Sequence, residues 1–223
     1  MQTGADPGPK PPVIEFDCVA FGHNDTLLLT DVTFSFSSGR FYLIHGPAGA
    51  GKTTFLRLCY LDLQPASGVA TIFGQTSHDI DRDGKARSRR RMGIVEQSPQ
   101  FLPNLSVQQN VALPLRLTEQ AGARDEADLR ELLDWVGLED GACGLLNAEA
   151  RRRAALARAL VLSPDIVLAD DITGDDLLSL LEQLSRSGQT VIATTSDPGL
   201  GQTVEATHLE IAKKTLRLCE SDE

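Results

Sequence analysis

The sequence predicts an α/β fold in which a sheet of parallel strands carries a glycine-rich loop. Three short apolar runs, at residues 92–97, 165–170 and 190–196, have the composition of strands buried in a parallel sheet. A glycine-rich segment at 46–51 separates a strand-like run from a helix-like run. Between 107 and 163, apolar residues recur three and four positions apart, which is typical of helices. This order indicates a sheet core with a helical insertion.

Further strands are expected before the first of these runs. Residues 13–20 and 32–45 hold alternating or apolar β-type stretches, and a Ser-Ser-Gly turn at 37–39 predicts that the second stretch is a hairpin. Another short strand is expected at 69–74. Together these segments predict an antiparallel β layer. Residues 1–12 are polar and rich in proline and glycine, so we expect a disordered lead.

The C-terminal segment 208–220 alternates, turns at two lysines and alternates again, which predicts a terminal hairpin. We therefore expect an α/β core formed by residues 13–97 and 163–223, with residues 98–162 inserted as an α-helical subdomain. A chain of 223 residues is long enough to bury such a core.

Composition and charge argue against several classes of protein. Hydrophobic residues make up 41% of the chain and charged residues 23%, as in ordinary globular proteins. The net charge of −10 argues against nucleic acid as a partner. The arginine-rich stretches at 85–91 and 151–153 are expected to be solvated helix faces. No apolar run approaches the ~18 residues of a membrane span, and no signal peptide is expected.

The four cysteines are far apart and show no spacing typical of a metal site. They are Cys18, Cys59, Cys143 and Cys219. We expect buried, reduced thiols in a cytosolic protein.

The segment GPAGAGKTT at 46–54 matches the phosphate-binding motif G-x-x-x-x-G-K-[ST]. Its glycines allow a tight loop whose backbone N–H groups point at phosphates, and the helix that follows adds its positive end. Lys52 is expected to reach the terminal phosphates, and the Thr53 hydroxyl to hold Mg²⁺. A glycine-rich turn without ligand is the alternative, which the complete motif disfavours. The residues expected to bind the nucleotide are Gly46, Pro47, Ala48, Gly49, Ala50, Gly51, Lys52, Thr53 and Thr54.

Two carboxylates follow the apolar run at 165–169. Asp170 is placed to hold a magnesium ion through water. Asp171 stands where a general base would activate the attacking water. A carboxylate at a strand end is more often only a turn residue, but the phosphate loop upstream favours the functional interpretation.

The order and spacing of these segments resemble those of the ABC-type ATPases, and among them the bacterial FtsE (cell-division) and lipoprotein-release group. The likeness covers about residues 13–217 and includes the stretches SGVATIFGQ, RRRMGIVEQSPQFLPNLSVQQNVALPL and LSPDIVLADDITGD. It implies a P-loop NTPase core of ABC type with ATP and Mg²⁺ as ligands. It also implies a cytoplasmic protein, peripheral at the inner face of the cell membrane. Its partner would be an integral membrane protein, FtsX-like or a transporter permease, and it would form a homodimer or a heterodimer with another ABC subunit.

The resemblance also assigns roles to single residues. Gln97 matches the glutamine that contacts Mg²⁺ and the attacking water, which makes it a candidate for metal binding and for catalysis beside Asp171. Residues 98–115 correspond to the surface that meets the cytoplasmic helix of a membrane partner. Phe21 resembles the aromatic residue that stacks on adenine, and a phenylalanine of the core is the alternative.

Residues 146–150 depart from the family pattern. There the family carries a serine and two glycines that bind the γ-phosphate of the opposite subunit's ATP, whereas this chain has Asn147, Ala148 and Glu149. The last two side chains obstruct a close approach of the backbone. A carboxylate 4 Å from another negative charge is repelled by roughly 4 kcal/mol at an effective dielectric constant of 20. The segment nevertheless suits a helix start, because Asn147 is a strong N-cap and Glu149 complements the helix dipole.

Other departures from the family pattern lie at and after the proposed general base. Where the family uses glutamate as the general base, Asp171 is one methylene shorter, and Ile172 follows it in place of proline. Ser196 occupies the position of the family's switch histidine. The helix after Gly174 is shorter than in the family by about two turns of 3.6 residues.

These departures predict a degenerate ABC subunit that binds Mg-ATP and docks on a membrane partner but hydrolyses slowly or not at all. Two alternatives stay open. One is a working ABC ATPase that powers a transporter or a cell-division complex, and the other is a non-catalytic interaction scaffold with nucleotide as a structural ligand. A partner subunit could supply a better segment at 146–150, but it could not replace Asp171 or Ser196.

Overall fold

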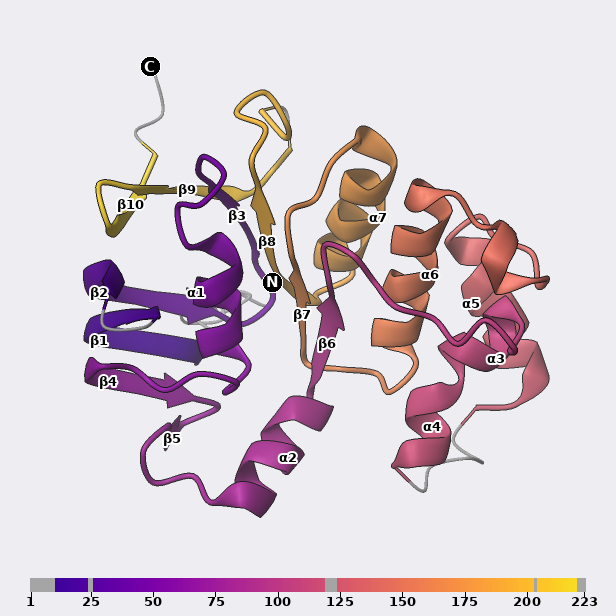
Figure 1. The fold of residues 1–223 in the computed structure, drawn as a ribbon, viewed down its shortest axis with the longest axis horizontal. Coiled ribbons are helices and arrows are strands. Elements are labelled where there is room, and N and C mark those ends of the chain that lie inside the picture. The colour runs from indigo at the N-terminus through magenta and orange to yellow at the C-terminus, as the bar shows by residue number, and fades with distance from the viewer. Residues whose placement is uncertain (1–10, 24–25, 119–123, 203, 220–223) are drawn as a thin grey trace, which may run out of the picture.

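The computed structural model describes residues 11–23, 26–118, 124–202 and 204–219. These residues form two sheets, with helices between and beside them (Figure 1). The strands are β1 (Pro12–His23), β2 (Thr26–Ser37), β3 (Phe41–His45), β4 (Ser67–Ile72), β5 (Gln75–Thr76), β6 (Met92–Val95), β7 (Ile166–Ala169), β8 (Thr190–Thr195), β9 (Thr207–Ala212) and β10 (Thr215–Leu218). The helices are α1 (Lys52–Cys59), α2 (Arg82–Arg90), α3 (Val107–Val111), α4 (Leu113–Leu117), α5 (Glu126–Trp135), α6 (Ala148–Leu160) and α7 (Asp175–Arg186), with a 3₁₀ turn at Cys143–Leu145. Within these ranges no helix has the length and apolar character needed to cross a membrane.

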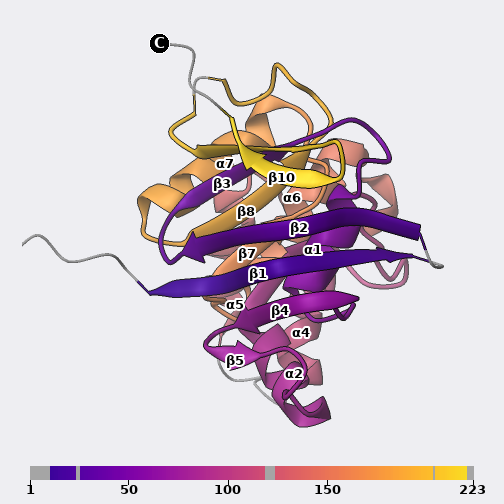
Figure 2. The ribbon, with the colours of Figure 1, turned by 90° about the vertical axis from the view of Figure 1, so that its left-hand side faces the viewer.

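The smaller sheet has the strand order β2-β1-β4-β5 and forms the predicted antiparallel layer. The larger sheet has the order β10-β9-β3-β8-β7-β6, in which only the β10–β9 pair is antiparallel. Figure 2 looks onto the antiparallel layer, whose strands lie in front of α1. Because parallel strands end at the same edge of a sheet, the loops after β3, β6, β7 and β8 meet there.

Most strands predicted from the sequence are confirmed, and so is the terminal hairpin formed by β9 and β10. The hairpin predicted at 32–45 is wrong. A turn does follow β2, but β2 pairs with β1, whereas β3 pairs with β8 and β9 in the other sheet. The burial of the strands explains the difference. β3 is a continuous apolar run that is covered on both faces, while β2 alternates and suits a sheet with one face toward solvent.

The ends of the chain differ from expectation in small ways. Residues 1–10 of the predicted lead lie outside the described residues, and Pro12 already begins β1. The prediction of buried cysteines holds for Cys59 and Cys143 but is wrong for Cys18 and Cys219, which are exposed. Cys18 has a φ of 48° where the pairing of β1 is irregular, and Cys219 follows the edge strand β10, so neither side chain enters the core.

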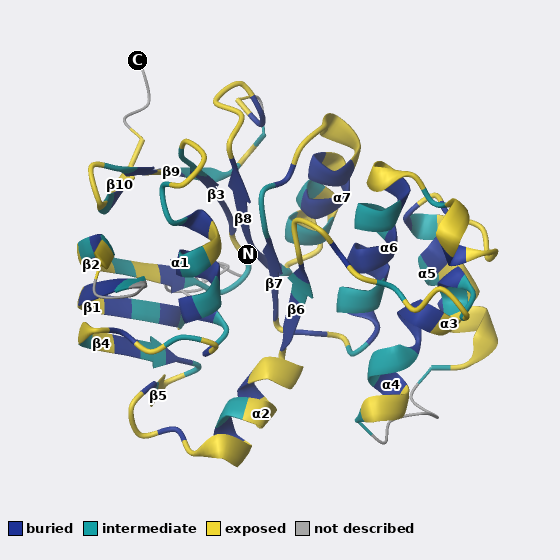
Figure 3. Cartoon of the chain, in the orientation of Figure 1, coloured by how far each residue is buried: buried dark blue, intermediate teal, exposed yellow. Residues whose placement is uncertain are grey.

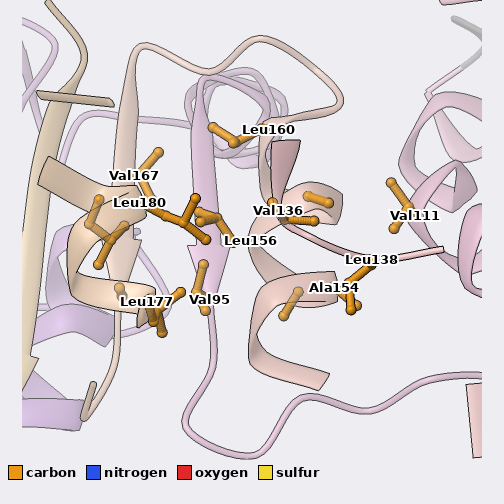
Figure 4. Packing of buried hydrophobic residues seen from close by; sticks show 14 of the residues in the cluster. Val95, Val111, Val136, Leu138, Ala154, Leu156, Leu160, Val167, Leu177 and Leu180 are labelled. Carbon is orange, nitrogen blue, oxygen red and sulfur yellow. The ribbon is translucent and has the colours of Figure 1, made fainter. Parts of the chain in front are cut away.

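Two apolar clusters hold the layers together. The first is rich in phenylalanine and lies between the antiparallel layer, α1 and one face of the larger sheet; the Phe55 ring of α1 lies 5.5 Å from that of Phe16 and 6.0 Å from that of Phe36. The second is aliphatic and packs α6, α7 and the helices beyond them against the other face (Figure 4). Figure 3 shows that buried residues line these inner faces, while α2 and α4 expose much of their surface.

Two features fix the positions of β6, α6 and the loop that follows β6. Gly93 in β6 lets α6 approach, since a Cβ there would lie 2.7 Å from the carbonyl oxygen of Ala159. The fully buried Asn110 of α3 donates from its amide to carbonyls within residues 102–106 and accepts from the Leu102 N–H. These bonds satisfy a buried polar group and give the loop after β6 a defined shape.

Candidate nucleotide-binding site

The loop at residues 46–51 connects β3 to α1 at the carboxyl edge of the larger sheet. Gly49 and Gly51 have positive φ values of 80° and 101°, a conformation that glycine adopts without strain. Gly51 is also the N-cap of α1, and it has no side chain to occupy the first turn of the helix. The positive end of α1 is therefore presented to the loop, as the phosphate-binding motif requires.

Lys52 is only 6% exposed, and three oxygen atoms surround its ammonium group. Its Nζ donates to the carbonyl oxygens of Gly46 at 2.8 Å and Pro47 at 3.1 Å, and to the Ser196 hydroxyl at 2.8 Å. The cation thus lies within the loop, where a P-loop lysine meets phosphate oxygens.

Thr53 and Asp170 come together from α1 and the end of β7. Thr53 Oγ1 donates to Asp170 Oδ2 at 2.8 Å, and the other carboxylate oxygen accepts from Thr194 Oγ1 at 2.9 Å. A hydroxyl and a carboxylate are oxygen donors of the kind Mg²⁺ prefers, so this pair fits the ion. Sequence reasoning missed Thr194, whose only signal is its place near the end of the apolar run that forms β8.

The two predicted catalytic residues are in direct contact. Gln97 Nε2 donates to Asp171 Oδ2 at 2.7 Å, and Ser196 Oγ donates to Asp171 Oδ1 at 2.7 Å. Asp171 has a φ of 48°, in the left-handed region, and its N–H donates to Thr194 Oγ1 at 2.8 Å. Loops after β6, β7 and β8 therefore converge on one carboxylate.

A cavity of about 310 Å³ opens among these side chains. This volume is within the roughly 300–1,000 Å³ of typical ligand pockets. Leu28 of β2 adds an apolar wall from the antiparallel layer. Sequence reasoning missed Leu28, because nothing in the local pattern shows which leucine of 27–29 faces a ligand. The lining residues are Leu28, Ala48, Gly49, Gly51, Lys52, Thr53, Thr54, Gln97, Asp171 and Ser196.

Phe21 does not line this cavity. Its side chain is 1% exposed, and its ring lies 6.2 Å from that of Phe55 in the phenylalanine-rich cluster. Stacking on adenine needs an accessible ring face, which a fully buried side chain does not offer. Of the two interpretations of Phe21, the structure supports the core residue.

A second cavity, of about 480 Å³, shares Thr53 and Gln97 with the first. We call it the Gln97 groove. An Arg57–Asp62 ion pair of 2.7 Å lies in its wall, and burial together with the Asp62 carboxylate raises the pKa of Tyr60. Its lining residues are Thr53, Leu56, Arg57, Tyr60, Asp62, Ile94, Val95, Glu96, Gln97, Ser98, Gln100, Leu168 and Asp170.

The start of α6 is capped as the sequence predicts. Asn147 Oδ1 accepts from the Ala150 N–H at 2.8 Å, and Glu149 in the first turn pairs with Arg153 at 3.6 Å. The arginines at 151–153, however, are half-buried and do not form the predicted solvated face. Arg153 illustrates the reason, because its guanidinium also donates to the carbonyls of residues 136 and 137.

Comparisons with known proteins agree with this geometry. A sequence model described as ABC transporter matches residues 29–174, more than half of the chain. The lipoprotein-releasing system ATP-binding protein LolD of Bordetella pertussis is 36% identical over 185 residues, which cover 78% of this chain and 80% of LolD. The cell division ATP-binding protein FtsE of Streptococcus pneumoniae is 29% identical over 198 residues, which cover 84% of this chain and 86% of FtsE.

The three-dimensional likeness extends over nearly the whole chain. The dimeric structure of a post-hydrolysis state of the ATP-binding cassette MJ0796, bound to ADP and Pi, matches with a TM-score of 0.79 and 26% identity. The match covers 93% of this chain and 99% of that one. Relatives as different in role as LolD and FtsE support the family and not one role within it. The chain belongs to the ABC transporter family, as one of its ATP-binding members.

Proposed function

We propose that this chain is the ATP-binding subunit of a membrane complex of the LolD and FtsE kind, and that it binds Mg-ATP but hydrolyses it slowly or not at all. One contrast carries the proposal. The phosphate loop is complete, whereas both carboxylate oxygens of Asp171 are already engaged, by Gln97 and by Ser196. The first feature supports binding of nucleotide, and the second disfavours turnover.

ATP would be held chiefly through its phosphates. The backbone N–H groups of residues 46–54 and the Lys52 ammonium supply the positive side of the cavity. Thr53, Gln97 and Asp170 would hold Mg²⁺, which neutralises charge on the phosphate oxygens when it is bound. Leu28 offers an apolar surface to the purine.

Slow hydrolysis is expected from the chemistry of the catalytic half. General-base assistance contributes typically about 10²–10⁴-fold to a rate, provided that the base lies within reach of the water. Asp171 is one methylene shorter than glutamate, and the bonds from Gln97 and Ser196 hold both of its oxygens in place, so the carboxylate is not free to move toward a distant water. Both features lower the expected turnover.

The proposed partner is an integral membrane protein, FtsX-like or a transporter permease, whose cytoplasmic helix enters the Gln97 groove and meets residues 98–115. Two observations support this docking surface. The groove shares Thr53 and Gln97 with the nucleotide cavity, so a partner seated there would touch residues that hold the ligand. Leu102, in the same segment, is 52% exposed and offers an apolar contact. Such docking would place the chain at the cytoplasmic face of the membrane.

Membrane attachment tests the docking surface. Leu102→Glu places a charge on the exposed leucine and should release the protein from membranes of its own cell, as measured by fractionation and by recovery of the membrane partner in a pull-down. Leu218→Glu on β10 is the matched control, since this leucine is 60% exposed and distant in sequence from the groove. Wild-type attachment of the Leu102 variant would contradict the docking surface.

An active ATPase is the second candidate function, and the convergence of Asp171, Gln97 and Ser196 on one cavity favours it. Phosphate release, measured with and without the recovered partner, separates the two. Vigorous turnover in either condition would favour the active enzyme. Docking that is identical with and without nucleotide would favour the interaction scaffold instead.

A further inference from the structure

Ser196 links the phosphate loop to the catalytic carboxylate. Its Oγ lies 2.8 Å from Lys52 Nζ and 2.7 Å from Asp171 Oδ1. The first of these contacts joins residues 144 positions apart in the sequence. With the bond from Gln97 to Asp171, the side chains form one continuous series of hydrogen bonds from Lys52 to Gln97.

Chemistry fixes the direction of each bond in this series. An ammonium group can only donate, and a carboxylate can only accept. The Ser196 hydroxyl therefore accepts from Lys52 and gives its single proton to Asp171. While Ser196 donates this proton to Asp171, its hydroxyl has no proton left to donate to a ligand in the nucleotide cavity.

The donors of Lys52 are all used without a ligand. Lys52 uses its three ammonium protons on two loop carbonyls and Ser196. Asp171 accepts one bond on each oxygen. A phosphate that is to receive a bond from Lys52 must displace one of these three acceptors, so the resting network competes with the ligand.

The backbone around Ser196 holds it in place. The carbonyl of Thr195 accepts from the Gly46 N–H at 3.2 Å, and the buried Thr195 hydroxyl donates to the Ile172 carbonyl at 2.9 Å. Ser196 is thus tied on one side to the start of the phosphate loop and on the other to the segment after Asp171. Its own side chain is exposed, which leaves room for the substitutions used below.

We propose that Ser196 is a positioning residue that latches Lys52 and Asp171 together in the nucleotide-free protein. The inference rests on the proposed nucleotide binding and deepens it, because it names a side chain that opposes binding. Since both ADP and ATP present phosphates to Lys52, the latch weakens the binding of both. A serine that instead donated to the γ-phosphate would favour ATP alone.

Calorimetric titration of the full chain with Mg-ATP and with Mg-ADP tests the latch. Ser196→Ala should bind both nucleotides about 3- to 10-fold more tightly than wild type, because one charge-assisted bond that competes with the phosphates is removed. Ser196→Thr restores the hydroxyl and should return both affinities to the wild-type values. Ser67→Ala, which removes an exposed hydroxyl that lines neither the nucleotide cavity nor the Gln97 groove, should change neither affinity.

The other outcomes separate the latch from the proposed function. If Ser196→Ala weakens ATP but leaves ADP unchanged, Ser196 contacts the γ-phosphate and the latch is wrong. If wild type and Ser196→Ala bind nucleotide equally, the latch fails while nucleotide binding stands. If neither protein binds nucleotide, the proposed function fails and the latch with it.

Discussion

Two helices of this protein begin in opposite ways. α1 starts at Gly51, a residue without a side chain, and Lys52 follows it. α6 starts at Asn147, whose side chain accepts the Ala150 N–H, and Glu149 adds a carboxylate to its first turn. One helix therefore presents a positive end that no side chain caps, and the other presents an end that Asn147 already caps and that carries the Glu149 carboxylate.

A phosphate site at a helix end has two requirements. The positive end of a helix attracts an anion only while its first N–H groups remain available and no carboxylate lies beside them. α1 meets both conditions, whereas in α6 the Asn147 side chain occupies the Ala150 N–H and Glu149 places a carboxylate in the first turn. In the proposed account this chain holds one nucleotide with α1 but cannot use α6 to grip a second nucleotide across a dimer interface.

Loss of the Lys52 ammonium group at the start of α1 should have the largest effect on nucleotide binding. Lys52→Ala takes away the ammonium that lies within the loop and should abolish the calorimetric heat of Mg-ATP binding. Lys85→Ala on α2 changes the net charge equally and should leave binding intact. Undiminished ATP binding by the Lys52 variant would show that α1 is not the phosphate site.

The next largest effect concerns the catalytic residue Asp171, which we expect to be a poor general base. Asp171→Glu adds back the missing methylene and should raise phosphate release by up to about 10²-fold, at the lower end of general-base assistance. Asp165→Glu is the matched control, because Asp165 pairs with Arg91 and lines neither the nucleotide cavity nor the Gln97 groove. A fast wild-type rate that Asp171→Ala leaves unchanged would contradict the assigned base.

Removal of the side chains that obstruct the start of α6 should have a smaller effect, which is expected only when Mg-ATP is present. We expect wild type to stay largely monomeric with Mg-ATP. The triple change Asn147→Ser, Ala148→Gly, Glu149→Gly removes a negative charge and should allow an ATP-dependent dimer, clearest at low salt where screening is weakest. The cost to the helix is about 0.3–1 kcal/mol for the lost first-turn carboxylate, less than the repulsion removed next to a polyphosphate.

Analytical ultracentrifugation with and without Mg-ATP measures this change. Asn147→Ser alone keeps a capping side chain and the carboxylate, and it should remain monomeric like wild type. An ATP-induced dimer of the unmodified chain would show that Glu149 does not face nucleotide.

The smallest expected effect is a dependence of protein stability on pH, caused by a histidine next to the phosphate loop. His45 directly precedes Gly46, and its ring stacks on His208 with 3.1 Å between Nε2 and Nδ1. Burial and the His208 ring lower the pKa of His45 below its ordinary value of 6.5, against the opposing influence of Asp197 and Glu210. The unfolded chain therefore binds this proton more readily, and the associated stability is present above pH 6.5 and lost as the pH falls through the lowered pKa.

Thermal melting between pH 5 and 8 measures this dependence. His45→Gln should lose less stability than wild type on acidification, whereas His78→Gln, at an exposed position, should behave like wild type. A steeper loss of stability in the His45 variant would contradict the sign of the effect.

Local patterns predicted the parts of this molecule that depend on neighbours in sequence. The phosphate loop, the central strands and the Asn147 cap all follow from residues within a few positions of one another. The sheet to which β3 belongs did not follow, because a turn of Ser-Ser-Gly suits a hairpin and a crossover between sheets equally well.

Contacts between segments that are distant in the chain could not be predicted from local sequence patterns. The burial of Phe21 depends on α1 packing against β1, which brings Phe55 beside it. Leu28 and Thr194 enter the site only because two sheets and a helix meet at one edge. The hydrogen bond between Lys52 and Ser196 also joins distant segments, and the residues next to each of them in the sequence do not predict it.

A single-turnover experiment separates tight binding of ATP from its hydrolysis. The wild-type chain, in excess over γ-labelled Mg-ATP, is separated from free nucleotide by filtration, and the retained nucleotide is analysed over time. We expect the wild-type chain to retain nucleotide that stays intact ATP over many minutes, and Lys52→Ala to retain none. Rapid conversion of the retained ATP to ADP and phosphate, or no retention by the wild-type chain, would contradict this expectation.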